Sequence, residues 1–240
     1  MRSLFAALLL AAPVAAADYP ALPAAVSSLG AIAADGSLYV YGGHAGKTHS
    51  YDTKSVVGSF HRLKLEPNAK WEELPPGTIA QGMNLAARGG TVYRVGGMSP
   101  KNAPGEKSDN VSLATVQKFD PKVGKWESLP DLPAGRSSHD AVVVGDKLVV
   151  VGGWQMNGKD GKSTWHDTAL VLDLAKPEAK WESIPQPFQR RALTAAAVDG
   201  KVYVFGGLTS DAKSVRTVDV LDVASGKWST GPEFPGANRV

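Results

Sequence analysis

Short apolar runs that end in a pair of glycines recur four times along the chain. The runs are LYVYGG, VYRVGG, LVVVGG and VYVFGG, and their last residues, Gly43, Gly97, Gly153 and Gly207, are 54, 56 and 54 residues apart. Short runs rich in Val and Tyr are typical of buried β-strands. A period of this length indicates that the chain consists of four copies of one structural unit.

Each of these strands is preceded by another apolar segment and a turn. The clearest example is Ser137–Gly153, in which the dipeptide Gly145-Asp146 separates two apolar runs. Such a pattern predicts an antiparallel hairpin, and the near absence of polar residues indicates that both of its faces are buried. The other copies place Asp35-Gly36, Gly89-Gly90 and Asp199-Gly200 at the turn.

The second half of each unit also repeats. A polar loop of variable length leads to a third strand, expected at Phe60–Leu65, Thr115–Phe119, Ala169–Leu172 and Val218–Leu221. An acidic residue ends that strand (Glu66, Asp120, Asp173, Asp222), and a fourth strand carries a Lys-Trp pair with Trp71, Trp126, Trp181 or Trp228. One four-stranded antiparallel sheet cannot bury both faces alone, whereas sheets stacked around an axis can. We therefore predict an all-β fold, a β-propeller with four four-stranded blades at about residues 22–76, 77–131, 132–186 and 187–235.

The glycine pairs, acidic residues and tryptophans resemble the kelch-repeat family, whose propeller is similar to the central domain of galactose oxidase. The resemblance covers about residues 20–240. It implies structural roles for the motif residues: the glycines allow close approach of backbones, and the tryptophans pack between adjacent blades. The glycines are Gly42, Gly43, Gly96, Gly97, Gly152, Gly153, Gly206 and Gly207. A tyrosine found in many kelch repeats between the glycines and the tryptophan has no consistent counterpart here.

The register of the repeats suggests that the sequence stops inside the pattern. Counting back from the glycine pairs, the repeats begin at Val26, Ala80, Arg136 and Arg190, and Arg239 falls at the same position after Trp228. Residues 236–240 would then be the start of a further repeat. We expect a partial chain whose parent has five to seven blades. The alternatives are a closed ring of four blades and an open arc completed by a second copy.

Composition excludes several classes of function. Among 240 residues, 26 Lys+Arg against 23 Asp+Glu leave a net charge of only +3 without a basic run, so we expect no nucleic-acid partner. The chain has no Cys, which rules out disulfides, thiolate zinc sites and cysteine nucleophiles. The family's copper-radical oxidases require a cysteine crosslinked to tyrosine, so that activity is excluded as well. No cofactor is predicted.

Candidate binding residues lie in loops expected at one end of the propeller, because variable loops on a rigid scaffold are where binding residues concentrate. Arg136 and Arg190 begin their repeats, and an arginine suits a carboxylate or phosphate group. His44, Trp154, Trp165 and His166 lie in the long loops that follow the glycine pairs, and the two tryptophans offer flat surfaces to a sugar or peptide. The alternative is that the arginines pair with loop carboxylates and the tryptophans pack locally.

No pattern of catalytic or metal-ligating residues stands out. His44, His49 and Asp52 match no strong ligand spacing, and no metal site is predicted. The run Ser137-Ser138-His139-Asp140 contains the residue types of a catalytic triad. Adjacent residues of a strand point to opposite faces, however, so these side chains do not converge.

Two classes of function follow. The first is a binding module that presents its loops to a glycan, a peptide or a partner protein, and we favour it because it needs no catalytic constellation. The second is a sugar-active enzyme similar to the sialic acid mutarotases among exported kelch proteins, which would use an acid/base residue and an arginine such as Arg136 or Arg190.

The N-terminus has the layout of a secretory signal peptide. In Met1–Ala17, Arg2 precedes an apolar stretch from Leu4 to about Ala12, Pro13 breaks it, and small residues Ala15-Ala16-Ala17 follow. The stretch is too short to span about 30 Å of hydrocarbon. We therefore expect a secreted or periplasmic protein with no membrane span in the mature chain of residues 18–240.

This interpretation predicts that the protein isolated from its native host begins near Asp18. N-terminal sequencing would test it, because recovery of an intact Met1 would show that the leader is retained.

Overall fold

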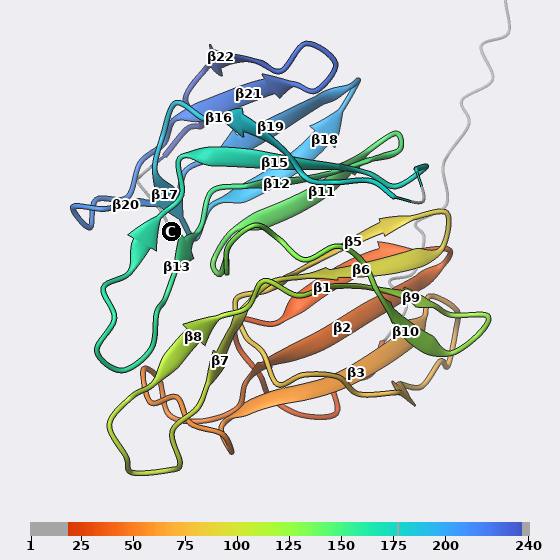
Figure 1. Ribbon diagram of the computed structural model, residues 1–240. Coiled ribbons are helices and arrows are strands. Elements are labelled where there is room, and N and C mark those ends of the chain that lie inside the picture. Colours follow the sequence, from red (N-terminus) through yellow and green to blue (C-terminus); the bar gives the residue numbers. More distant parts are fainter. Residues whose placement is uncertain (1–18, 177, 237–240) are drawn as a thin grey trace, which may run out of the picture.

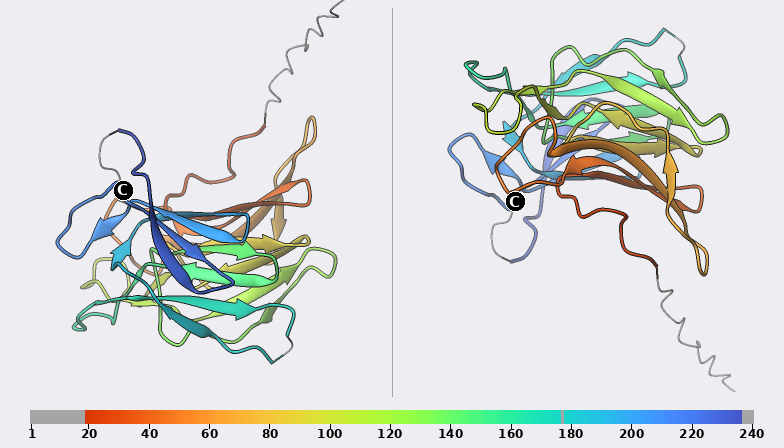
Figure 2. Two further views of the ribbon diagram at one scale, coloured as in Figure 1. Left: turned by 90° about the horizontal axis from the view of Figure 1, so that it is seen from above. Right: turned by 90° about the horizontal axis from the view of Figure 1, so that it is seen from below.

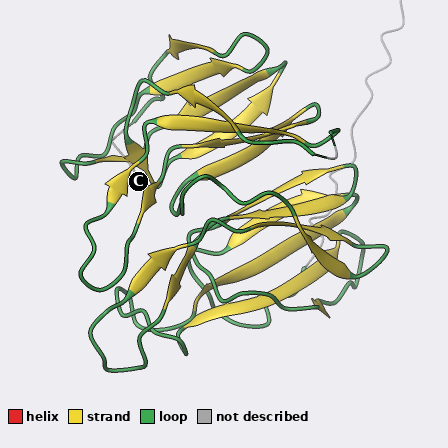
Figure 3. Cartoon of the chain, viewed as in Figure 1, coloured by secondary structure: helices red, strands yellow, loops and turns green. Residues whose placement is uncertain are grey.

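The computed structural model describes residues 19–176 and 178–236, and in this part of the chain it contains strands and loops without α-helices (Figure 3). The predicted signal peptide and the predicted start of a further repeat at Arg239 lie outside the described residues. None of the described residues forms a helix long and apolar enough to cross a bilayer.

Four four-stranded antiparallel sheets form the blades of a propeller (Figure 1), which confirms the predicted fold class. Blade 1 contains β1 (Gly30–Ala34), β2 (Ser37–His44), β3 (Val56–Lys64) and β4 (Glu72–Leu74). Blade 2 contains β5 (Asn84–Arg88), β6 (Thr91–Val95), β9 (Val116–Asp120) and β10 (Lys125–Ser128). Blade 3 contains β11 (Asp140–Val144), β12 (Lys147–Val151), β15 (Thr168–Asp173) and β16 (Glu182–Pro185). Blade 4 contains β18 (Thr194–Val198), β19 (Lys201–Phe205), β21 (Val218–Asp222) and β22 (Lys227–Gly231).

Three small two-stranded sheets project from the loops that follow the glycine pairs. They are formed by β7 (Met98–Pro100) with β8 (Asn110–Ser112), β13 (Trp154–Gln155) with β14 (Thr164–Trp165), and β17 (Arg190–Arg191) with β20 (Leu208–Thr209). The sequence analysis treated these segments as irregular. It also placed every tryptophan inside the fourth strand, whereas Trp71 and Trp181 lie one residue before β4 and β16.

The innermost strands of successive blades lie side by side in the order β1, β5, β11, β18. Within the described residues, β18 does not pack against β1 in the same way. Blade 4 lies at the top of Figure 1 and blade 1 at the bottom, and Figure 2 shows the same blades along the perpendicular direction. The four blades therefore have three tightly packed junctions.

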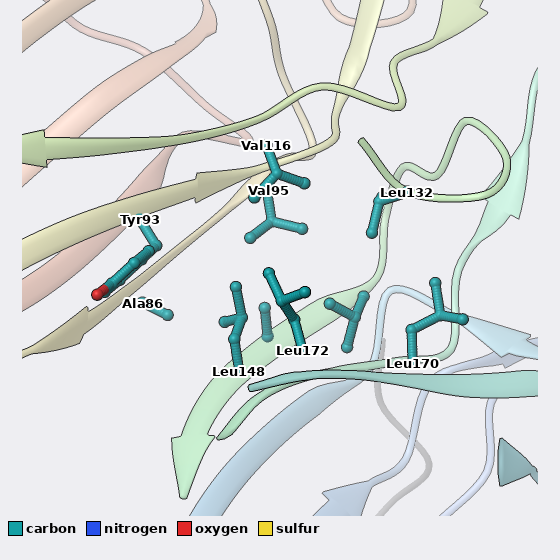
Figure 4. Packing of buried hydrophobic residues seen from close by; sticks show 10 residues of the cluster. Ala86, Tyr93, Val95, Val116, Leu132, Leu148, Leu170 and Leu172 are labelled. Atoms are coloured by element: carbon teal, nitrogen blue, oxygen red, sulfur yellow. The ribbon is translucent and has the colours of Figure 1, made fainter. Parts of the chain in front are cut away.

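Each junction contains its own apolar core. Between blades 2 and 3, Tyr93 and Val95 of one sheet pack against Leu148 and Leu172 of the next (Figure 4). Two similar clusters fill the junctions of blades 1 and 2 and of blades 3 and 4. Burial of apolar surface contributes about 25 cal/mol per Å², so these three cores supply most of the stability of the arc.

One backbone hydrogen bond recurs at all three junctions. The N–H of the second glycine of a pair donates to the carbonyl of the residue that begins the next blade. The pairs are Gly43 to Ala80 (2.8 Å), Gly97 to Arg136 (2.8 Å) and Gly153 to Arg190 (2.7 Å).

The first glycine of each pair makes this approach feasible. Gly96 has a φ of 54°, and a Cβ atom placed on it would lie 2.4 Å from the carbonyl oxygen of Arg136. Gly42 and Gly152 show the same positive φ and the same close carbonyl. Any other residue would combine a strained backbone with a collision against the next blade.

The tryptophans connect each blade to the linker that precedes it. The indole N–H donates to the carbonyl of Pro20 from Trp71, of Pro75 from Trp126, and of Pro130 from Trp181, at 2.9–3.1 Å. Trp126 also packs against Phe60 and Phe119, with ring centroids 4.9 and 5.2 Å away. The tryptophans are thus part of the junctions, with one edge left accessible to solvent.

His139 occupies a position of the repeat that is otherwise apolar. Its ring lies against Gly96 of blade 2, as Met83 lies against Gly42 and Leu193 against Gly152. His139 is 5% exposed, and neither ring nitrogen has a hydrogen-bond partner among the described residues. Burial, together with the nearby Arg136 cation, lowers the pKa of His139 to about 3.

Asp140, the next residue, connects three blades near the axis. Its carboxylate accepts hydrogen bonds from the amide of Asn84 in blade 2 and, at 2.5 Å, from the N–H of Ala195 in blade 4. Burial raises the pKa of Asp140 to about 6 despite these donors. Protonation of this carboxyl therefore favours the folded state, and its contribution is lost as the pH rises through about 6.

The glycine geometry predicts that Gly96→Ala lowers the free energy of unfolding by about 4 kcal/mol, in the range of exceptional single substitutions. Gly124→Ala is a matched control, because Gly124 has a φ of 72° and no atom within 4 Å of the added methyl group. The control should cost only about 1–2 kcal/mol of backbone strain. Urea unfolding of both variants would measure the difference, and equal losses would show that the close approach between blades does not matter.

The burial of His139 predicts a specific acid sensitivity. An unfolded histidine titrates near pH 6.5, so between that value and about 3 only the unfolded state binds this proton, and stability falls as the pH is lowered. His139→Leu, which restores the residue found at Leu193, should lose about 2 kcal/mol less stability than the wild type between pH 7 and pH 5. Urea unfolding at both values would test this. Wild-type and variant stabilities that change in parallel would contradict it.

Candidate functional site

A chain of backbone hydrogen bonds surrounds one end of the propeller axis. Ser28, Gly82, Ser138 and Ala192 lie two residues before the inner strands and have positive φ angles of 50–55°. The N–H of each one donates to the carbonyl of its counterpart in the preceding blade at 2.8 Å, from Gly82 to Ser28, from Ser138 to Gly82, and from Ala192 to Ser138. This backbone forms a rigid floor to which every blade contributes one residue.

The residues just before this floor present side chains at its rim. Each of them pairs with the residue that follows a glycine pair: Ser27 with His44, Gln81 with Met98, Ser137 with Trp154, and Arg191 with Leu208. The repeat therefore brings eight positions from four blades to one mouth. Because these positions differ between repeats, the mouth has different chemistry on each side.

A pocket of about 380 Å³ opens at this mouth. Ser137 and Ser138 form part of its floor. Arg191, Trp154, Met156, Met98, Tyr51 and His49 contribute to its walls. The pocket combines one cation, aromatic faces and polar groups, which is the usual composition of a small-ligand site.

Arg191 is the only arginine among the residues that line this pocket. Its guanidinium carbon lies 4.4 Å from the ring centroid of Trp154 and 5.8 Å from that of Trp165. These two indoles face each other across the β13–β14 pair, with centroids 5.6 Å apart. Stacking on indole holds a guanidinium in place without using its N–H donors.

The hydrogen-bonding capacity of Arg191 is left available by its surroundings. Its Nε is buried without a partner, and none of the ion pairs among the described residues involves this side chain. Partial burial lowers the pKa of Arg191 from its very high ordinary value, a change that leaves the group charged at neutral pH. A ligand anion would supply the missing acceptor.

Three long loops above the pocket hold one another in place. The amide of Asn102 donates to the carbonyl of Tyr51 at 3.0 Å, which connects the loop of blade 1 to that of blade 2. The carboxylate of Asp109 accepts the N–H of Lys159 at 3.0 Å, which connects blade 2 to blade 3. The pocket walls are therefore fixed to one another as well as to the blades.

The structure places Arg136 and Arg190, the two arginines predicted to bind a ligand, inside the blades. Arg136 is 2% exposed and donates to the carbonyls of Gly152 and Thr168 at 3.2 and 2.9 Å. Arg190 is 3% exposed, donates to the carbonyl of Gly206 at 2.7 Å and pairs with Asp219. Both guanidiniums connect strands of their own blade, close to the structural alternative considered for them.

His44 and His166 are also buried and serve the loops. Nε2 of His44 lies 3.0 Å from the carbonyl of Ser50, and its ring meets that of Tyr51 edge to face at 4.8 Å. Nε2 of His166 lies 3.0 Å from the carbonyl of Gly135. Burial lowers the pKa of His166 to about 4, with a further contribution from Arg136. Both histidines therefore hold loop backbone in position.

Of the residues predicted to bind, the structure brings Trp154 to the pocket wall and Trp165 directly behind it. Sequence reasoning missed Arg191, although it lies next to Arg190. The missing signal was the bridge that turns the second residue of each repeat toward the mouth while the first turns inward. No group of three His, Asp or Glu side chains placed to hold a metal ion occurs within residues 19–176 and 178–236.

Comparison with known proteins agrees with this architecture. The Kelch motif matches residues 81–133, 135–187 and 189–235, which together make up more than half of the chain. Kelch-like protein 35 of Mus musculus is 24% identical over 217 residues, which are 90% of this chain and 32% of that protein. Kelch-like protein terF of Aspergillus terreus is 30% identical over 133 residues, 50% of this chain and 28% of that protein. The chain thus spans about a third or less of these relatives.

A solved structure has the same fold. The structure of YjhT superposes with a TM-score of 0.70 at 18% sequence identity, over 91% of this chain and 69% of the other. The repeats, the blades and the Kelch motif matches together show that this chain belongs to the kelch-repeat family of β-propellers.

Proposed function

We propose that this propeller is a binding module whose mouth pocket receives an anionic group of a glycan, peptide or protein ligand. The observation that carries the proposal is Arg191, a guanidinium stacked on Trp154 without an anionic partner among the described residues. Its planar N–H fork matches a carboxylate or phosphate. The adjacent indole faces supply apolar surface to the part of the ligand next to the anion.

The rigidity of the pocket supports binding as its function. Its floor is backbone held by hydrogen bonds at 2.8 Å, and its walls are loops connected through Asn102 and Asp109. Little conformational entropy is lost when a ligand meets a surface that is already ordered.

A sugar-active enzyme of the mutarotase type is the second candidate. The observation in its favour is that His49, an imidazole able to act as acid or base, lines the same pocket as Arg191. His139 and His166, by contrast, are buried away from the pocket. Anomer exchange followed by NMR on acidic sugars distinguishes the two candidates, since a binding module leaves the exchange rate unchanged.

The proposed role of Arg191 predicts that Arg191→Ala weakens binding of an acidic ligand by about 10–100-fold, the effect of losing a charged hydrogen bond. Arrays of sialylated and uronic-acid glycans and of acidic peptides would identify a probe, and calorimetry would compare the variants. Arg216→Ala is the matched control, because Arg216 already pairs with Glu233 at 2.7 Å. Equal affinity of the wild type and Arg191→Ala would refute the proposal.

A further inference from the structure

The three blade junctions define the kind of surface that a blade of this protein packs against. In each junction, the face of one sheet covers the opposite face of the next. On the face directed toward the following blade, Tyr39 and Tyr41 of blade 1 are 2% and 0% exposed, and Val149 and Val151 of blade 3 are both 0% exposed.

Blade 4 has the same face without the same cover. By strand register, Tyr203 and Phe205 of β19 correspond to Tyr39 and Tyr41 of β2, yet both are only partly buried. Ala196 on the neighbouring strand β18 is exposed, and Val198 is 52% exposed. At the end of this face, Leu193, Phe205 and Phe234 line an apolar hollow beside the last glycine pair.

Blade 1 has the complementary face. In blade 2, the side chains directed toward the preceding blade include Met83, Leu85 and Val92, which are 4%, 2% and 0% exposed. The corresponding residues of blade 1 are Leu29, Ala31 and Leu38. Ala31 is exposed, and Leu29 and Leu38 are partly exposed.

We propose that the blade 4 face of one copy of this protein binds the blade 1 face of a second copy, head to tail. The argument is continuity with an established interface, because the chain already forms this junction three times with residues of the same types at the same register. An apolar face with exposed Val198 and half-buried Tyr203 and Phe205 is stabilised by a cover, and the matching cover is the face that carries Leu29.

Such an interface is heterologous, since the two faces are different surfaces of the same chain. Copies joined in this way form a closed ring if the rotation closes and an open series if it does not. In both cases assembly increases with concentration, and a change on only one face is sufficient to stop its growth.

Two substitutions on opposite faces test the proposal. Val198→Glu places a charge on the blade 4 face and Leu29→Glu on the blade 1 face, both at positions with access to solvent. Sedimentation over a wide concentration range should show assembly of the wild type and monomers of each variant. An equal mixture of the two variants should form a dimer and nothing larger, because Val198→Glu keeps an intact blade 1 face and Leu29→Glu an intact blade 4 face.

Val123→Glu is the control, because Val123 is 60% exposed in the β9–β10 turn, away from both faces. It should assemble like the wild type. Thermal melting checks that each variant is folded, and Ala196→Glu replaces Val198→Glu if the latter is not. The proposal is overturned by a wild type that stays monomeric throughout, by single variants that assemble like the wild type, or by a mixture that forms no dimer.

Discussion

The arrangement of the blades depends on one backbone contact, the hydrogen bond from the second glycine of each pair to the first residue of the next blade. At 2.7–2.8 Å this bond brings two sheets together at the point where the chain passes from one to the other. The contact exists because Gly42, Gly96 and Gly152 have positive φ angles and no side chain. Once the backbones are that close, the apolar faces behind them are in register and bury each other.

Much of this architecture can be predicted from the sequence, because the contact leaves a mark in it. A glycine that must avoid a carbonyl 2.4 Å away cannot be replaced without strain, and so the pairs stand out at a regular spacing. The apolar runs before them indicate strands buried on both faces. The irregular part of each repeat carries no such constraint, which is why the small sheets formed by β7–β8 and β13–β14 were not predicted.

The site was harder to predict, because neighbouring residues of the same type differ in direction. Arg190 turns inward and pairs with Asp219, whereas Arg191 reaches Trp154 at the mouth. Sequence alone does not distinguish them, since the difference arises from a bridge between segments 17 residues apart in the chain. Trp154 and Trp165 were singled out for their aromatic surface. Their pairing across a two-residue hairpin became visible only in the structure. The export signal at the N-terminus stays a prediction.

The position of Arg191 over two indoles has a practical consequence. Indole fluorescence responds to a nearby cation and to the polarity of its surroundings, and Trp154 lines the pocket while Trp165 lies behind it, 5.6 Å away. An occupant that draws the guanidinium toward itself would alter the light emitted by this pair. The protein thus carries a built-in optical reporter, by which unlabelled compounds can be screened before anything about their identity is established.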